Sequence, residues 1–172
     1  LLTGFWPWSM PALAYRFLAG AAAAYVVGGL ITLTRPRWNE SEFLNLTVLI
    51  YGVALLAAIL LQLNLIDWTQ PVAWLFMTVV SFAFVVVLYY FWQKRGSVQK
   101  DSAQALGTPL RIFLIILGIA ATGVGALVYI FPQQAGFIWP WSALSTWKLL
   151  DSRLIASMLL TVGGGAFVVW WR

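Results

Sequence analysis

The stretch from Trp139 to Gly165, WPWSALSTWKLLDSRLIASMLLTVGGG, decides the fold class. It holds a Trp-Pro-Trp triplet, then one arginine, Arg153, and then an apolar run. A related stretch, WPWSMPALAYRFLAGAAAAYVVGG, runs from Trp6 to Gly29 and aligns when Arg16 is placed on Arg153. The later stretch has four extra residues between its triplet and its arginine. Because each apolar run is long enough to cross a lipid bilayer, we predict an integral membrane helix bundle.

The composition favours the same class. Of the 172 residues, 62% are hydrophobic and 9% are charged, whereas about 25% of a soluble domain is charged. A chain with so few charges cannot cover its surface with polar groups, so lipid must be part of its solvent. Only helices or a closed barrel can satisfy the backbone there. The segments are apolar on every side for about twenty residues, without the alternation of barrel strands, so they are predicted to be helices.

Five spans are predicted along the chain. Their approximate bounds are Ala12–Leu33, Phe43–Leu65, Pro71–Trp92, Pro109–Phe131 and Ser152–Trp171. Asn39 and Glu42 have the spacing of a capping box before the second span, and Thr108 is predicted to cap the fourth. The segment Ser142–Leu150 is too polar to span and follows several tryptophans, so it is predicted to be a helix lying in the membrane interface.

The two related stretches begin the first and fifth spans. An even number of crossings separates these spans, so they are predicted to run in the same direction. This arrangement indicates a parallel internal repeat of about four helices, related by an axis along the membrane normal. The single transmembrane domain, residues 1–172, then divides into a first repeat unit, 1–131, and the start of a second, 132–172. On this interpretation the second unit is truncated and the chain is a piece of a longer protein.

Basic residues predict the orientation of the bundle. With alternating crossings, one face carries Arg16, Lys148 and Arg153. The other face carries Arg35, Arg37, Lys94, Arg95, Lys100, Arg111 and Arg172. Cytoplasmic loops of membrane proteins are rich in Lys and Arg. We therefore predict a multi-pass protein of the cell membrane, with the start of the chain outside and loops 34–42 and 93–109 in the cytoplasm. This topological role explains the net charge of +5 without a nucleic-acid partner.

Two sets of residues are candidate contacts for lipids or other ligands. The tryptophans of the two triplets are Trp6, Trp8, Trp139 and Trp141. They are expected either to anchor the chain at the membrane interface or to stack on a pigment, quinone or sterol. Arg16 and Arg153 lie near the outer boundary of their spans. They are expected either to snorkel to the headgroups or to bind an anion such as a lipid phosphate or a substrate carboxylate.

Small residues recur at the spacing of helix contacts. These candidate packing residues are Gly20, Ala24 and Gly28 in the first span, Ala54 and Ala58 in the second, and Ala121 and Gly125 in the fourth. Such faces let helix backbones approach closely, and dispersion and shape then hold the helices together in lipid. The third span, from Trp74 to Trp92, has no glycine. It is predicted to meet lipid, a carotenoid-like ligand or another subunit.

Absent residue types exclude several functions. The chain has no cysteine and no histidine. Zinc, haem and iron–sulfur clusters therefore cannot be held through these ligands. Away from their ends, the predicted spans lack the ionisable residues that proton relays and ion-coupled carriers use. Asp67 and Asp151 are predicted to be isolated carboxylates in outer loops. We therefore predict no catalytic residue, no metal ligand and no enzymatic activity.

These patterns predict a non-catalytic accessory or scaffold subunit of a larger membrane assembly. By analogy with respiratory and photosynthetic complexes, such a subunit packs against other transmembrane subunits and holds lipid, quinone or carotenoid by apolar contact. The alternative is a transporter or carrier for a small neutral or anionic solute, built on the parallel repeat, with Arg16 and Arg153 as paired recognition groups. Further spans with Asp, Glu or His at mid-membrane would favour the carrier.

Overall fold

The computed structural model describes residues 12–34, 38–93, 106–134 and 149–171, and these ranges hold five α-helices. They are α1 (Ala12–Thr34), α2 (Trp38–Leu60), α3 (Pro71–Gln93), α4 (Thr108–Ile130) and α5 (Leu149–Trp171), with a short 3-10 helix, η1 (Leu63–Leu65), after α2. Each α-helix has 23 residues and is about 35 Å long. All five are long and apolar enough to cross a membrane, which confirms the prediction of an all-helical chain with five candidate spans.

The predicted helix ends need correction at three places. The second span was placed five residues too late at both ends, so Asn39 lies inside α2 and does not cap it. Gly107, not Thr108, is the N-cap of α4. The fifth helix begins at Leu149, three residues earlier than predicted, which places Asp151 in its first turn. The outer-loop position predicted for Asp151 is therefore wrong, and its side chain is buried.

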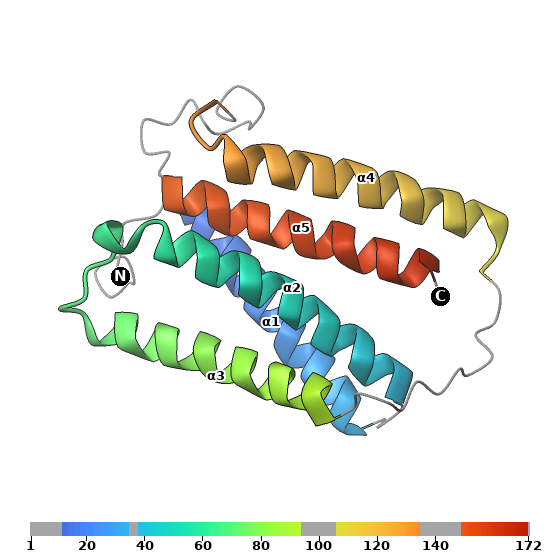
Figure 1. Cartoon of the computed structure of the whole chain (residues 1–172), viewed down its shortest axis with the longest axis horizontal. Coiled ribbons are helices and arrows are strands. Elements are labelled where there is room, and N and C mark those ends of the chain that lie inside the picture. Colours follow the sequence, from blue (N-terminus) through green and yellow to red (C-terminus); the bar gives the residue numbers. More distant parts are fainter. Residues whose placement is uncertain (1–11, 35–37, 94–105, 135–148, 172) are drawn as a thin grey trace.

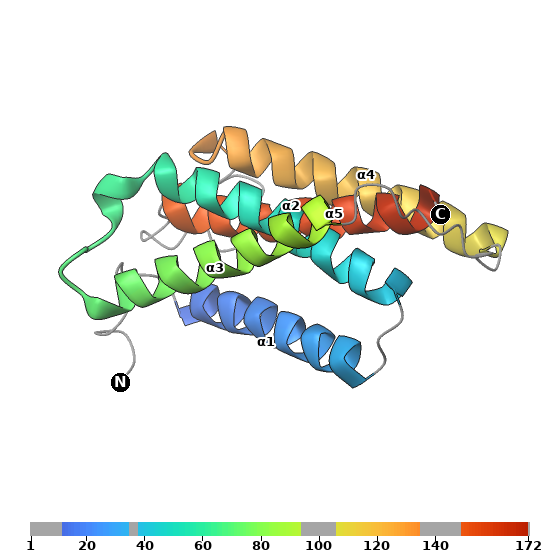
Figure 2. The same cartoon turned by 60° about the horizontal axis from the view of Figure 1, so that its bottom comes forward.

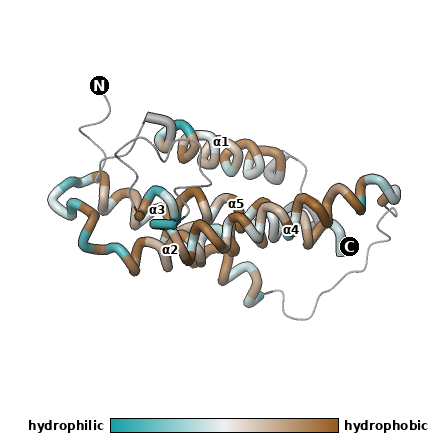
Figure 3. The backbone as a smooth tube through the Cα atoms, turned by 90° about the horizontal axis from the view of Figure 1, so that it is seen from above, coloured by the Kyte–Doolittle hydropathy of each residue, from teal (hydrophilic) through white to brown (hydrophobic). Residues whose placement is uncertain are grey.

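Successive helices run in opposite directions, so α1, α3 and α5 are parallel to one another (Figure 1, Figure 2). α5 occupies the centre of the described bundle, where it packs most extensively against α4, then against α2, and more weakly against α1. α3 packs against α2. Figure 3 shows that hydrophobic residues cover most of each helix and that hydrophilic residues lie mainly towards the helix ends.

The closest helix contact in the described part of the chain is the crossing of α4 and α5. A Cβ added at Gly163 would lie 2.7 Å from the amide nitrogen of Thr122, and one added at Gly125 would lie 3.0 Å from the amide nitrogen of Leu160. Both neighbours are backbone atoms, so the two helices can approach this closely only because these positions have no side chain. Dispersion grows with such close approach, which is how helices associate where lipid is as apolar as they are.

A hydrophobic cluster joins four helices at the end of the bundle where α1 begins. Its buried members are Ala14 of α1, Leu55 and Ile59 of α2, Ile66, Ala73 of α3, and Leu150 and Leu154 of α5. Ala14 is the only buried side chain among those described in α1. Beyond this cluster, α1 is therefore held less firmly than the other helices, and a space opens between α1 and α5.

Candidate functional site

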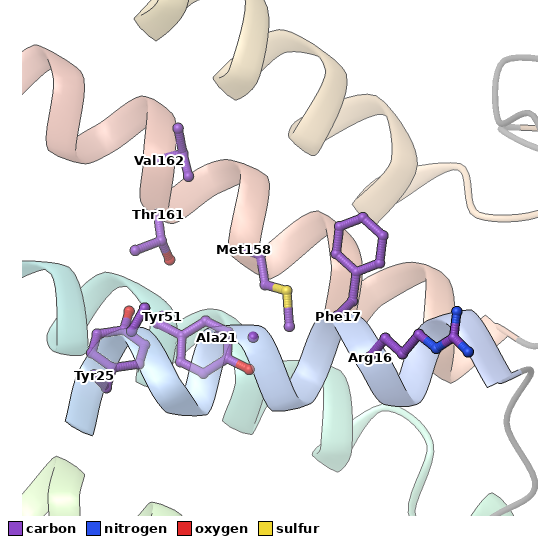
Figure 4. Close-up of a pocket in the computed structure, with 10 residues that line it drawn as sticks. Arg16, Phe17, Ala21, Tyr25, Tyr51, Met158, Thr161 and Val162 are labelled. Carbon is purple, nitrogen blue, oxygen red and sulfur yellow. The ribbon is translucent and has the colours of Figure 1, made fainter. Parts of the chain in front are cut away.

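A groove of about 480 Å³ lies between α1 and α5, and we call it the α1–α5 groove (Figure 4). Its lining residues are Arg16, Phe17, Gly20, Ala21, Ala24 and Tyr25 of α1, Tyr51 of α2, and Met158, Thr161 and Val162 of α5. Arg16 lies at one end of the groove, and Tyr25 lies towards the other. The ring of Tyr25 is 5.6 Å from that of Tyr51, centre to centre, so aromatic rings of two helices meet at the inner end.

The sequence of α1 produces the groove through three positions spaced four residues apart. Arg16, Gly20 and Ala24 lie on one face of the helix because i and i+4 positions are neighbours. An added Cβ at Gly20 would meet nothing within 4 Å, and Ala24 is exposed. The small-residue face that was predicted to contact another helix therefore lines a hollow along this part of α1. At Gly28 the same face approaches α2, where an added Cβ would lie 2.9 Å from Leu44.

Two hydroxyl groups in the wall of the groove, those of Tyr25 and Thr161, are bonded to the backbone. The Tyr25 hydroxyl donates a hydrogen bond to the carbonyl oxygen of Thr47 at 3.4 Å. The Thr161 hydroxyl donates to the carbonyl oxygen of Ser157, one turn earlier in α5, at 2.8 Å. Such bonds reduce the polarity that the wall presents. The groove is mainly apolar, and Arg16 is the only charged residue among the described residues that line it.

The two arginines that the sequence aligns lie in different surroundings. Arg153 is half-buried in the first turns of α5, and its Nε–H donates a hydrogen bond to the carbonyl oxygen of Tyr129 in α4 at 3.3 Å. Arg16 is exposed at the end of the groove. Among the described residues, no carboxylate forms an ion pair with Arg16. Within the part of the chain that the structure describes, Arg16 is therefore open to an external anion, whereas Arg153 links α5 to α4.

The remaining candidate packing residues lie at contacts between α2, α4 and α5. Ala58 is fully buried. The carbonyl oxygen of Ala54 accepts a hydrogen bond from the Tyr129 hydroxyl at 2.7 Å. Ala121 and Gly125 are buried in α4, the helix that packs most extensively against α5. No sequence pattern indicated that Tyr129 bonds to α2, because tyrosine occurs on lipid-facing and buried surfaces alike.

The turn between α2 and α3 uses its carboxylate for a local bond. Oδ1 of Asp67 accepts the N–H of Thr69 at 3.0 Å and its hydroxyl at 2.6 Å. Because the hydroxyl and then the N–H favour the charged carboxylate, the pKa of Asp67 is lowered. The indole of Trp68 donates to the carbonyl oxygen of Leu63 at 3.1 Å, and that of Trp74 donates to Trp68 at 3.0 Å. Asp67 therefore stabilises a turn.

A buried amide lies just past the end of α2. Gln62 is 4% exposed, and neither atom of its amide has a hydrogen-bond partner in the part of the chain that the structure describes. In the same ranges, no group of three or more acidic residues could hold a metal ion. Trp6, Trp8, Trp139 and Trp141 lie outside the described residues, as does most of the predicted interfacial helix Ser142–Leu150.

Comparisons of the chain with models of protein families, with characterised proteins and with solved structures find no significant match. Its function must therefore be inferred from its own residues and their arrangement.

Proposed function

We propose that this protein is a non-catalytic accessory or scaffold subunit of a larger membrane assembly, of the respiratory or photosynthetic type by analogy. The observation that supports this proposal is the α1–α5 groove. Along it, no described residue covers the face of α1 formed by Gly20 and Ala24. Small-residue faces in membranes let a neighbour approach closely and bind by shape. An open face of this kind suits a protein that binds a neighbouring molecule by shape complementarity.

The hydrogen bonds of three hydroxyl groups in α2 and α5 support a binding role over a catalytic one. Ser157 donates to the carbonyl oxygen of Arg153 at 2.7 Å, and Thr47 donates to that of Leu44 at 2.8 Å. Together with Thr161, these hydroxyls bond to the backbone of their own helix, a common arrangement in apolar surroundings. Hydroxyls engaged in this way are poorly placed to move protons or to replace the water around an ion.

The carrier hypothesis receives less support from the two arginines. A solute site built on a parallel repeat would use Arg16 and Arg153 in equivalent roles. Arg153 instead donates to Tyr129, while Arg16 lies exposed at the groove. This difference argues against a paired recognition site and favours a binding role for Arg16 alone.

The internal repeat and the orientation also belong to the proposal. α1 and α5 run in the same direction (Figure 1), and each carries an arginine near its start, as a parallel repeat with units 1–131 and 132–172 requires. The excess of Lys and Arg in the loops predicts that the start of the chain is outside and that loops 34–42 and 93–109 are cytoplasmic. Accessibility labelling of single cysteines placed in the two sets of loops would test that orientation.

The scaffold role can be tested by site-specific photocrosslinking in native membranes. A photoreactive amino acid at Gly20 would report on the groove, and one at Gly123 in α4 is a matched control, because an added Cβ meets nothing within 4 Å at either position. We expect the chain to migrate as part of a larger assembly in mild detergent. We also expect position 20 to give a defined crosslinked product that position 123 does not.

A larger side chain placed in the groove provides a second test, with the yield of the assembly as the measured quantity. Gly20→Leu should lower the yield of the assembly, whereas Gly123→Leu should leave it unchanged. If the chain migrates alone in every mild detergent and positions 20 and 123 crosslink alike, the scaffold proposal is wrong.

A further inference from the structure

We propose that the α1–α5 groove binds one acyl chain of an anionic phospholipid and that Arg16 holds the phosphate of that lipid. This inference rests on the proposed function, because it names the occupant of the same groove. The scaffold role requires only that some neighbour fits there. The inference adds the chemical class of that neighbour and the residue that recognises its charge.

The length of the groove matches one leaflet of a bilayer. Arg16 and Tyr25 are nine residues apart in α1, which corresponds to about 13.5 Å along the helix axis. Half of a hydrocarbon core is about 15 Å thick. An occupant of the groove would therefore have its polar part at the level of Arg16 and its apolar end near the middle of the membrane. This is the shape of a phospholipid in a single leaflet.

A second transmembrane helix fits this space less well. Such a helix would have to continue past the groove into the other leaflet. There, α1 already lies against α2, since an added Cβ at Gly28 would be 2.9 Å from Leu44. The rings of Tyr25 and Tyr51 also meet at the inner end of the groove. A flexible chain that ends at this level requires no continuation.

The charge of the groove selects the headgroup. Of the described residues that line the groove, only Arg16 is charged, and no carboxylate in the described ranges is paired with it. A guanidinium presents several N–H donors that match phosphate oxygens, and hydrogen bonds between charged groups are the stronger ones. An anionic lipid is attracted by this charge more than a zwitterionic one, which carries a compensating positive group.

The walls of the groove suit a hydrocarbon chain. Gly20 and Ala24 leave room on the α1 side. Met158 and Val162 supply apolar contacts from α5 (Figure 4). The unbranched, flexible side chain of methionine adapts to irregular apolar neighbours. Since the surrounding lipid is equally apolar, the acyl chain is held in the groove by its shape. The selectivity of the site comes from the contact between Arg16 and the lipid phosphate.

Native mass spectrometry of the whole chain tests the proposal. The protein would be delipidated in mild detergent and exchanged into micelles that contain equal amounts of phosphatidylglycerol and phosphatidylcholine. We expect one phosphatidylglycerol to remain bound. Arg16→Gln should lower its retention about tenfold, the equivalent of one lost charge-assisted hydrogen bond, and should abolish the preference over phosphatidylcholine. Gly20→Leu, whose Cβ would have no neighbour within 4 Å, should lower retention of both lipids.

Two matched controls separate this site from general attraction to headgroups. Arg111 is an exposed arginine in the first turn of α4, and Gly123 is an open glycine on the same helix; Arg111→Gln and Gly123→Leu should both retain phosphatidylglycerol as the unchanged protein does. The proposal is overturned if the unchanged protein keeps no lipid, if Arg16→Gln and Gly20→Leu keep it equally well, or if Arg111→Gln loses it to the same extent.

The outcomes for the lipid and for the scaffold role can be told apart. A chain that retains no phosphatidylglycerol but crosslinks from position 20 to a protein partner would refute the lipid site and support the scaffold role. A chain that retains the lipid through Arg16 but never joins an assembly would refute the scaffold role and support the lipid site.

Discussion

Alanine substitution of the glycines near the α4–α5 crossing should destabilise the bundle in proportion to how close the opposing backbone lies. At Gly163, an added Cβ would lie 2.7 Å from the amide nitrogen of Thr122 and 3.0 Å from the carbonyl oxygen of Gly118. Neither atom can move without shifting α4, so the helices must separate. Overpacking of this kind costs about 1–3 kcal/mol. The higher helix propensity of alanine offsets about 1 kcal/mol of this cost, which leaves a net loss of up to about 2 kcal/mol for Gly163→Ala.

Other glycines provide a graded series for the same substitution. At Gly125 the nearest atoms, in Leu160, Leu159 and Ala156, would lie 3.0–3.2 Å from the new Cβ, so a smaller loss is expected. At Gly118 the nearest atoms belong to the ring of Phe167, at 2.9–3.0 Å. A ring can turn aside, so Gly118→Ala should be nearly neutral. Gly123 has no neighbour within 4 Å, and Gly123→Ala should be neutral or stabilising by up to about 1 kcal/mol.

Equilibrium unfolding in mixed micelles measures the free energies of this series. The protein in dodecyl maltoside would be titrated with sodium dodecyl sulfate and followed by helical circular dichroism. The expected order of stability is Gly123→Ala, then Gly118→Ala, then Gly125→Ala, and lowest Gly163→Ala. If Gly163→Ala and Gly123→Ala unfold at the same detergent fraction, the backbones of α4 and α5 are not in contact and the packing argument fails.

Three further substitutions test individual bonds. Tyr129→Phe removes the hydroxyl that donates to Ala54 at 2.7 Å and should cost about 0.6–1 kcal/mol in the same unfolding assay; no change would mean that the hydroxyl bonds equally well elsewhere. Arg153→Gln loses the bond to the Tyr129 carbonyl oxygen and should lower the melting temperature, whereas Arg16→Gln should not. Because the pKa of Asp67 is lowered by Thr69, its contribution is present above about pH 4 and is lost as pH falls further. The melting-temperature difference between the unchanged protein and Asp67→Asn should therefore disappear in acid, and a constant difference would contradict the Thr69 bond.

Hydropathy predicted the number and type of the helices, because a segment that crosses lipid must have apolar side chains and satisfy its own backbone hydrogen bonds. Capping and polar residues predicted the helix ends less accurately. The polar segment before Phe43 was taken to lie outside the second span, yet α2 begins at Trp38. Helix formation at a membrane boundary continues into polar residues, since water and headgroups satisfy them there. The same extension placed Asp151 inside α5, where proximity to an N-terminus favours a carboxylate.

The groove could be predicted only in part. The spacing of Gly20, Ala24 and Gly28 identified a face on which something can approach closely. It could not show whether a helix occupies that face, because the pattern of small residues describes one surface and the contact depends on two. Met158 and Tyr51 had no distinguishing pattern, because their roles depend on how α5 and α2 are placed beside α1.

The helices α1, α2 and α4 pack against different sides of α5. This arrangement explains why the two related stretches, which begin α1 and α5, have different surroundings. α5 carries three consecutive glycines, and an added Cβ at Gly163 would meet α4 while one at Gly164 would meet Ile50 of α2. With these two sides occupied, the surface of α5 at Met158 and Val162 faces α1 across the groove. Arg153 is consequently drawn into contact with α4, while Arg16 remains at an open groove. Arg16, on the peripheral helix α1, is therefore the arginine that can bind a lipid. Arg16 and Arg153 nevertheless occupy aligned positions in the two related stretches of sequence.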